Sequence, residues 1–146
     1  FASFARISPA IPLIGGGKTK FAPVYCVDVG KAITRALELK NTTPKIYEIA
    51  GPENYSFKEL MEILLTEIKK KRFLINISFN TAKFQSYFLQ MLPKPILTVD
   101  QVELLKYDNI PSGEYPDLKD LGVNGETINS ILPQYIYRFR TYGQFG

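Results

Sequence analysis

The sequence predicts a mixed α/β fold, in which about five helices are separated by short strands. Three observations support this prediction. Apolar residues recur at helical spacing in several segments, runs of β-branched and aromatic residues lie between those segments, and two helix starts carry capping boxes. A chain of 146 residues with 45% apolar and 22% charged residues can bury one core. We therefore expect residues 1–146 to form a single domain.

Residues 15–19, GGGKT, look like part of a phosphate-binding loop, but the spacing excludes the two common motifs. A Walker A loop needs a glycine five residues before its Gly-Lys pair, and Pro12 stands there. The dinucleotide fingerprint fails because Lys20 stands where its third glycine belongs. The following KFAPVYCV is aromatic and β-branched, which predicts a strand and not a helix. We therefore expect the glycines to form the turn of a β-hairpin.

Residues 28–39 predict a helix capped by the Asp28 carboxylate. One face of this helix is apolar, with Val29, Ala32, Ile33, Ala36 and Leu37. Residues 45–50, KIYEIA, form a nearly continuous apolar run, which predicts a strand covered on both faces.

Ser56 and Glu59 form a capping box at the start of the most regular helical pattern in the sequence. Its apolar positions are Phe57, Leu60, Met61, Leu64, Leu65 and Ile68. The basic run at residues 69–72 follows this helix, where cations oppose the negative end of its dipole. Residues 72–78, RFLINIS, predict the next strand.

Residues 80–92 predict a helix with an aromatic face, ended by Pro93 and Pro95. That face consists of Phe84, Tyr87, Phe88, Met91 and Leu92. Core packing is the simpler interpretation. The alternative is docking onto a partner protein or a membrane surface, because aromatic residues and methionine are favoured at such contacts.

The rest of the chain is predicted to contain two more helices. Thr98 and Gln101 form a second capping box, and the Pro-, Gly- and Asp-rich residues 109–125 predict a loop with a short turn at DLKDL. The last helix, residues 127–141, is expected to bend near Pro133. Its alternating aromatic residues and arginines suit nucleic acid, but Tyr135, Ile136 and Phe139 share one face. This favours a docking helix over a nucleic-acid contact.

Composition excludes several classes of site. The chain has no histidine, which excludes Ser-His-Asp and Cys-His catalysis and two-histidine zinc sites within it. Cys26 is the single cysteine, so an internal disulfide and a cysteine zinc cluster are excluded, and we expect a small core residue there. No metal site and no transmembrane segment are predicted. The chain starts at Phe1 within helical apolar turns, so we expect it to be a fragment.

The order of these pieces resembles a known family. The glycine turn leading into "KFAPVYCVDVGKAI", then "YEIAGPENYSFKELMEIL", and "LTVDQVELLKYDN" before "LKDLGV" look like the C-terminal half of an extended or atypical short-chain dehydrogenase/reductase (SDR). The most similar subgroup contains the NADPH-binding accessory subunit of respiratory complex I and its bacterial relatives. The resemblance covers essentially the whole chain. It implies an NAD(P)-binding Rossmann-type protein whose N-terminal half, with the glycine fingerprint, is absent here.

The resemblance suggests where a substrate would lie. In related epimerases an arginine precedes the strand that leads to the capping aspartate; here Phe21 takes that place, which disfavours a nucleotide-sugar substrate. The candidate pocket residues are Lys18, Lys20, Phe21, Pro23 and Tyr25. The two lysines are candidates to contact an anionic group of a substrate near the cleft, and the other three are expected to line the pocket wall. The family's Tyr-x-x-x-Lys pattern occurs once, at Tyr115 and Lys119, in a proline-containing loop, and we reject it. No catalytic or cofactor-binding residue is assigned.

The resemblance implies a structural or assembly role linked to respiratory NADH:quinone oxidoreductase, with NADP(H) or NAD(H) in the full-length protein. This fragment should be inactive and bind neither cofactor tightly. The alternatives are an active NAD(P)-dependent reductase or epimerase, and a protein-interaction module. Expected partners are the missing Rossmann half and respiratory complex subunits. The expected locations are the bacterial cytoplasm, peripherally at the inner membrane, or the mitochondrial matrix. Without its partner half the chain should self-associate through Val24, Ile46 and Ile49.

Overall fold

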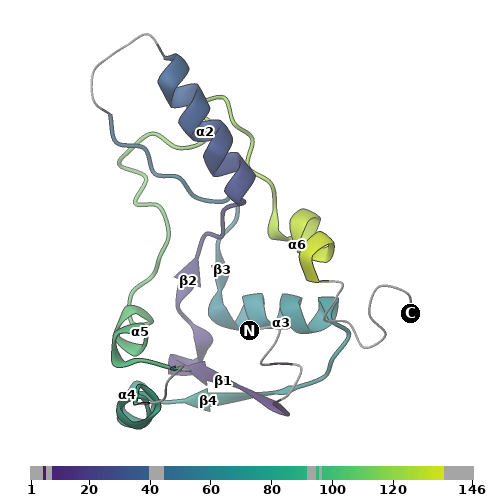
Figure 1. Ribbon diagram of the computed structural model, residues 1–146, viewed down its shortest axis with the longest axis vertical. Helices are drawn as coiled ribbons and strands as arrows, with labels where there is room; N and C mark the ends of the chain where they lie inside the picture. Colours follow the sequence, from purple (N-terminus) through teal and green to yellow (C-terminus); the bar gives the residue numbers. More distant parts are fainter. Residues whose placement is uncertain (1–4, 6–7, 40–44, 92–94, 96, 137–146) are drawn as a thin grey trace.

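The computed structural model describes residues 5, 8–39, 45–91, 95 and 97–136. Within them the protein is elongated, with helix α2 (Cys26–Glu38) at one end and a two-stranded sheet and helix α4 (Phe79–Leu89) at the other (Figure 1). The five helices and four short strands of these ranges confirm the predicted mixed α/β class. None of the helices in this part is both long and apolar enough to cross a bilayer.

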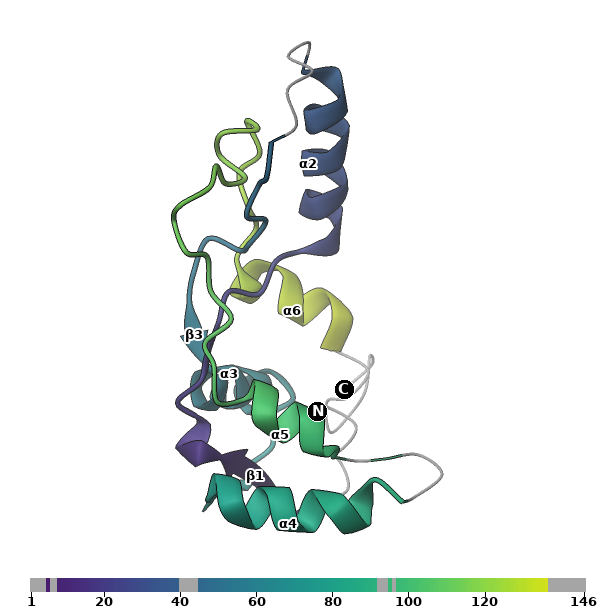
Figure 2. The same cartoon turned by 90° about the vertical axis from the view of Figure 1, so that its left-hand side faces the viewer.

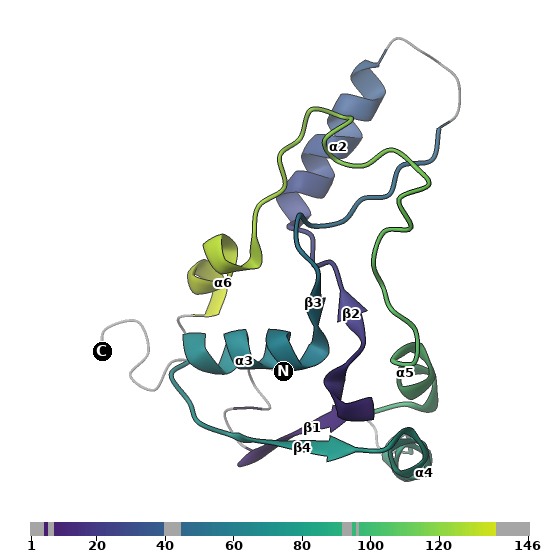
Figure 3. The same ribbon diagram turned by 180° about the vertical axis from the view of Figure 1, so that it is seen from behind.

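The strands form two separate pairs (Figures 1 and 3). Strand β1 (Ala10–Ile14) runs parallel to β4 (Phe73–Ile77), and β2 (Lys20–Phe21) runs antiparallel to β3 (Tyr55–Ser56). The other elements are the 3-10 turn η1 (Gly15–Gly17) and helices α3 (Phe57–Glu67), α5 (Val99–Leu104) and α6 (Ile128–Ile136). The predicted strand at residues 72–78 is thus confirmed as β4.

The glycine turn separates two strands that do not pair with each other, so the predicted hairpin is wrong. All three glycines have positive φ angles, which side chains rarely adopt. A Cβ on Gly15 would lie 2.3 Å from the Phe79 ring, and one on Gly17 would lie 3.1 Å from the backbone nitrogen of Lys58. The turn therefore packs against the first turns of α3 and α4, and this packing redirects the chain. The element that follows the glycines is β2, not a helix.

Helix α3 begins where the sequence predicts and carries the main core. The Ser56 hydroxyl accepts from the Glu59 amide at 3.2 Å, and the Glu59 carboxylate accepts from the Ser56 amide at 2.7 Å. The bond from the Ser56 amide, followed by a bond from the Ser56 hydroxyl to the same carboxylate at 2.8 Å, lowers the pKa of Glu59 below its usual value. The buried face of α3 packs on β1 and α6, and the core is formed by Ala5, Ile11, Leu13, Phe57, Met61, Leu64, Leu65, Ile68 and Ile136.

We predict that Ser56→Ala lowers the free energy of unfolding by about 1 kcal/mol, because it removes one half of the capping box. Glu59→Gln is the matched control, since its amide oxygen can still accept from the Ser56 amide. Urea unfolding followed by circular dichroism measures both. An equal loss of unfolding free energy in the two variants would contradict the prediction that the Ser56 side chain stabilises the helix as its cap.

Helix α2 differs from the prediction at its start. It begins at Cys26, within the predicted strand, and its N-cap is Tyr25, which makes no side-chain cap hydrogen bond. Asp28 is therefore not the cap; it lies buried in the first turn. Cys26 is exposed, not a core residue. The remaining contacts of α2 form a second core with a loop, and the buried members are Ala32, Leu118, Leu121 and Val123.

Two predicted apolar surfaces are left uncovered in the described part of the chain. Residues 45–50 form no strand, and Ile46 is 63% exposed, although Ile49 and Val24 pack beside the second core. On α4 the aromatic face points away from the core, so core packing is the wrong interpretation there. The exposed fractions are 66% for Phe84, 52% for Tyr87 and 62% for Phe88, and 81% for Met91, which follows the end of the helix at Leu89. Leu92 lies outside the described residues.

The C-terminal part follows the predicted pattern. Thr98 and Gln101 form the second capping box at the start of α5. A long loop with one turn at residues 118–122 then leads to α6, which contains Pro133. The predicted continuation to residue 141, with Phe139, lies outside the described residues.

Candidate functional site

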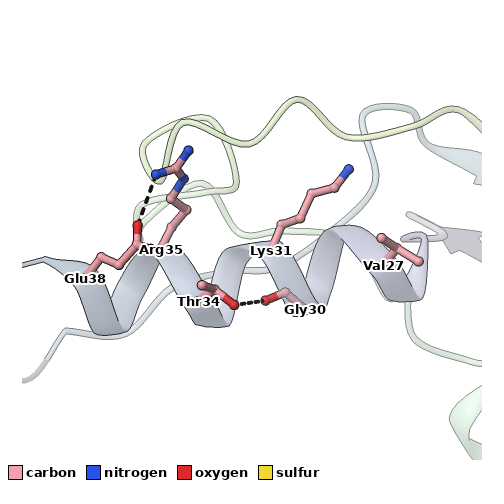
Figure 4. A pocket seen from close by; sticks show the side chains of 6 residues that line it. All are labelled: Val27, Gly30, Lys31, Thr34, Arg35 and Glu38. Atoms are coloured by element: carbon pink, nitrogen blue, oxygen red, sulfur yellow. Dashed lines mark hydrogen bonds and ion pairs between the residues drawn. The ribbon is translucent and has the colours of Figure 1, made fainter.

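Two surface hollows are candidates for a site. One, of about 610 Å³, follows the exposed side of α2 (Figure 4). All of its lining residues come from that single helix, and they are Val27, Gly30, Lys31, Thr34, Arg35 and Glu38. Arg35 and Glu38 pair with each other at 3.0 Å, so their charges are already matched. A groove on one helix brings no groups together from different parts of the chain, and we place the candidate site elsewhere.

The second hollow, of about 570 Å³, lies where four segments meet below α2. We call it the central groove. Its walls are mainly apolar side chains and backbone, from Phe21, Ala22, Pro23, Val24, Glu48, Ile49, Ala50, Leu60, Asn109, Ile110 and Pro111. These residues are separated by up to 90 positions in sequence, so the groove is a product of the tertiary fold.

Strand β2 holds one wall in place from both sides. On one side it pairs with β3; on the other, the Asn109 amide donates to the Lys20 carbonyl at 2.8 Å, and the Ala22 amide donates to the Asn109 carbonyl at 3.2 Å. The Asp108 carboxylate accepts from the Lys20 amide at 2.8 Å. The backbone of residues 20–22 therefore acts as the central strand of a small three-segment ladder, which fixes Phe21 against Phe57.

Gly51 allows the second wall to approach the first. Its amide donates to the Ala22 carbonyl at 3.2 Å, and a Cβ at Gly51 would lie 1.9 Å from the carbonyl oxygen of Pro23. No side chain fits at that distance, so the glycine of the Gly-Pro-Glu turn is required by the crossing of two backbones. The crossing sets the width of the central groove at Pro23 and Ala50.

Glu48 is the one titratable side chain among the described residues that line the groove. Its carboxylate accepts from the Ser112 hydroxyl at 2.7 Å, from the Ser112 amide at 3.0 Å and from the Gly113 amide at 2.9 Å. These bonds, the hydroxyl first, hold the pKa of Glu48 below its usual value. Glu48 is therefore an ionised anchor for the loop and is not poised to donate a proton at neutral pH.

The candidate residues from the sequence divide into two groups. Phe21 and Pro23 line the central groove, whereas Lys18, Lys20 and Tyr25 do not. The two lysine side chains are exposed. The Tyr25 and Tyr135 hydroxyls lie 3.2 Å apart, and this hydrogen bond raises the pKa of Tyr25 to about 12. Tyr25 thus joins the start of α2 to α6, and its role at a pocket stays a prediction.

Sequence reasoning missed the groove segments at residues 48–50 and 109–111. For the first segment, Gly51 after the apolar run KIYEIA could have indicated a close approach of two backbones. The segment at residues 109–111 has no comparable sequence pattern. Among the described residues, no three Asp, Glu, His or Cys side chains gather to hold a metal ion. The central groove is therefore chemically suited to binding an apolar group, with Asn109 and backbone amides for orientation.

Comparison with known proteins gives related sequences. Subunit 9 of the NADH dehydrogenase [ubiquinone] 1 alpha subcomplex, mitochondrial, from Arabidopsis thaliana is 31% identical over 157 aligned positions, covering 100% of this chain and 39% of that protein. The NADH-ubiquinone oxidoreductase 40 kDa subunit, mitochondrial, from Neurospora crassa is 29% identical, covering 86% of this chain and 34% of that protein. The Mus musculus subunit 9 is 26% identical, with coverages of 91% and 36%.

The chain spans less than two fifths of the length of these relatives. No protein-family model matches it. The resemblance drawn from the sequence is confirmed, since these relatives are subunits of the respiratory NADH dehydrogenase that it indicated.

Proposed function

We propose that this chain is the C-terminal part of a longer protein of the SDR-like group of complex I subunits, and that the longer protein supports a respiratory NADH dehydrogenase. The observation that carries this proposal is the alignment of the whole chain with a subunit of that enzyme at 31% identity. The relatives' names include the word mitochondrial, which supports a mitochondrial location. A bacterial location has no support among them.

The proposed role is structural or assembly-related, with NADP(H) or NAD(H) bound by the part of the longer protein outside these residues. Two features support this division. The glycine turn carries neither phosphate-binding motif and leads into a strand. Among the described residues that line the central groove, Glu48 has the one carboxylate. That carboxylate already accepts three hydrogen bonds from Ser112 and Gly113. In this proposal the chain closes the protein over its cofactor half and supplies an apolar wall.

Calorimetric titration tests where the cofactor binds. We expect NADPH to bind the longer protein and to release no measurable heat with residues 1–146 alone. Tight binding by the 146-residue chain would overturn the assignment of the cofactor site to the other half. A longer protein that binds neither NADPH nor NADH would overturn the cofactor part of the proposal.

Native electrophoresis of mitochondrial membranes tests the link to the respiratory enzyme. The longer protein, followed with an antibody, should migrate with the band that oxidises NADH. Migration apart from that band would contradict the role. A Tyr-x-x-x-Lys pair upstream, whose replacement abolishes reduction of a substrate without changing that migration, would establish the reductase alternative instead.

A further inference from the structure

Strand β4 and helix α4 lie at the lower end of the molecule in Figure 1, and both carry exposed apolar side chains. On β4, Phe73 is 78% and Ile75 is 51% exposed. They alternate with Leu74, which packs with the core under α3, so they lie on the opposite face of the sheet. On α4 the exposed aromatic face is opposite the buried Ala82. We call this surface the underside: Phe73, Ile75, Phe84, Tyr87, Phe88 and Met91.

Other elements of the fold cover the opposite side of both parts of the underside. Helix α3 lies above the sheet and α5 lies above α4 in Figures 1 and 2. The helix pair is held by a core of Ile14, Ala82 and Val102, which occupies the inner side of α4. Phe84 and Phe88 contact each other edge to face, with centroids 5.3 Å apart. Within the described residues, this aromatic pair and Met91 therefore face outward.

The charge of the chain is concentrated in the same stretch. From Lys69 to Val99 the sequence has six Lys or Arg residues and no Asp or Glu. The remaining residues carry 12 cations and 14 acids, so the whole excess of positive charge lies here. Lys69, Lys70 and Lys71 follow α3 and lead into β4, beside Phe73. They form a basic rim at one edge of the underside.

One cation of this stretch, Lys83, is already paired with an acid on α5. Glu103 on α5 accepts from Lys106 at 2.6 Å and from Lys83 at 2.7 Å. The Lys106 bond, followed by the Lys83 bond, lowers the pKa of Glu103 to about 2. The carboxylate is thus ionised and neutralised by two ammonium groups. The stretch from Lys69 to Val99 contains no Asp or Glu, so no acid within it can pair with the rim lysines.

We propose that the underside docks onto the surface of an anionic lipid bilayer. An outward aromatic surface beside a basic rim matches both layers of such a bilayer, because the aromatic side chains can contact the acyl chains and the lysines can contact the anionic headgroups. Helix α4 has 11 residues, fewer than the roughly 20 needed to cross a bilayer, so the proposed contact is with the bilayer surface. This contact is additional to the proposed role with NADH dehydrogenase and does not depend on cofactor binding.

Flotation with vesicles tests the proposal on the full-length protein. Vesicles of equal parts phosphatidylglycerol and phosphatidylcholine should carry the protein upward, and phosphatidylcholine vesicles should carry much less. Phe84→Ser with Phe88→Ser should weaken binding about a hundredfold, at about tenfold per buried ring. Lys69→Gln with Lys71→Gln should weaken it about 25-fold at low salt, at about fivefold per lysine.

Matched controls lie at the other end of the molecule. Ile33→Ser with Leu37→Ser removes exposed apolar residues of α2, and Lys45→Gln with Lys119→Gln removes two exposed cations. Both controls should float like the parent protein. Equal flotation with neutral vesicles, no flotation at all, or equal losses in the controls would overturn the proposal. A changed sedimentation mass in the phenylalanine variant, with unchanged flotation, would show a protein contact and also overturn it. The lysine variant decides the outcome if the phenylalanine variant fails to fold.

Discussion

Gly51→Ala should lower the free energy of unfolding by about 3 kcal/mol, because the new methyl group would overlap a backbone oxygen. The carbonyl oxygen of Pro23 lies 1.9 Å from the position of that Cβ, and a backbone atom cannot rotate aside as a side chain can. One of the two chains must move. The hydrogen bond from the Gly51 amide to the Ala22 carbonyl would then lengthen or break. Urea unfolding of the variant and the parent measures the loss.

Gly30→Ala provides the matched control, since both variants add one methyl group to a glycine. Gly30 lies on the exposed side of α2, and a Cβ there has no atom within 4 Å. Alanine is the better helix former by about 1 kcal/mol, so this variant should be more stable than the parent. Equal stability of Gly51→Ala and the parent would show that the two backbones are not in contact at Pro23.

Local patterns predicted the parts of the fold that depend on neighbouring residues. Both capping boxes, at Ser56 and Thr98, were readable because the cap and its partner lie three residues apart. The buried face of α3 was readable because one helix repeats its apolar positions every three or four residues. The loop at residues 109–125 was readable from its Pro, Gly and Asp content.

Pairing between distant segments was not readable. The hairpin prediction already treated the residues before the glycines as a strand, but nothing in the apolar run of β1 identifies β4, about 60 positions later, as its partner. The hairpin was the natural interpretation because β2 is the nearest strand. The same limit applies to residues 45–50. Their apolar run predicts a strand, but a strand forms only where another segment lies beside it to pair with, and the sequence does not show whether one does. The limit applies also to α4, whose aromatic face satisfies the helical pattern whether or not another element covers it.

Only one wall of the central groove was predicted, the one whose residues belong to the motif that carries the family resemblance. Phe21 and Pro23 follow the glycine turn and lead to α2, so they could be located from the motif. Asn109 and Pro111 come from a loop that meets β2 through backbone hydrogen bonds, which involve atoms common to every residue. The side chains of this loop therefore gave no indication that it would form the other wall of the groove.

Asp28→Ala should lower the free energy of unfolding by about 2 to 3 kcal/mol at neutral pH, because it removes two charge-assisted hydrogen bonds at a buried site. The Asp28 carboxylate is 0% exposed. It accepts from the Lys31 ammonium at 2.9 Å and from the Glu126 amide at 2.8 Å. The second bond joins the first turn of α2 to the loop before α6, 98 positions away. Loss of the carboxylate leaves the Glu126 amide without its partner, and α2 loses this link to the loop before α6.

The same carboxylate gives the effect a defined pH dependence. Burial acts to raise the pKa of Asp28, but the hydrogen bonds from Lys31 and Glu126 outweigh it, and the pKa is lower than the usual value. An acid with a lowered folded pKa contributes stability above its unfolded pKa, near pH 4, and loses it as the pH falls through the folded value. The difference between Asp28→Asn and the parent should therefore be largest near neutral pH and shrink below pH 4. Asp100→Asn, at an exposed position of α5, is the control and should change stability by less than about 0.5 kcal/mol. A difference for Asp28→Asn that stays constant from neutral to acid pH would mean that side-chain shape, and not ionised hydrogen bonding, holds the loop to α2.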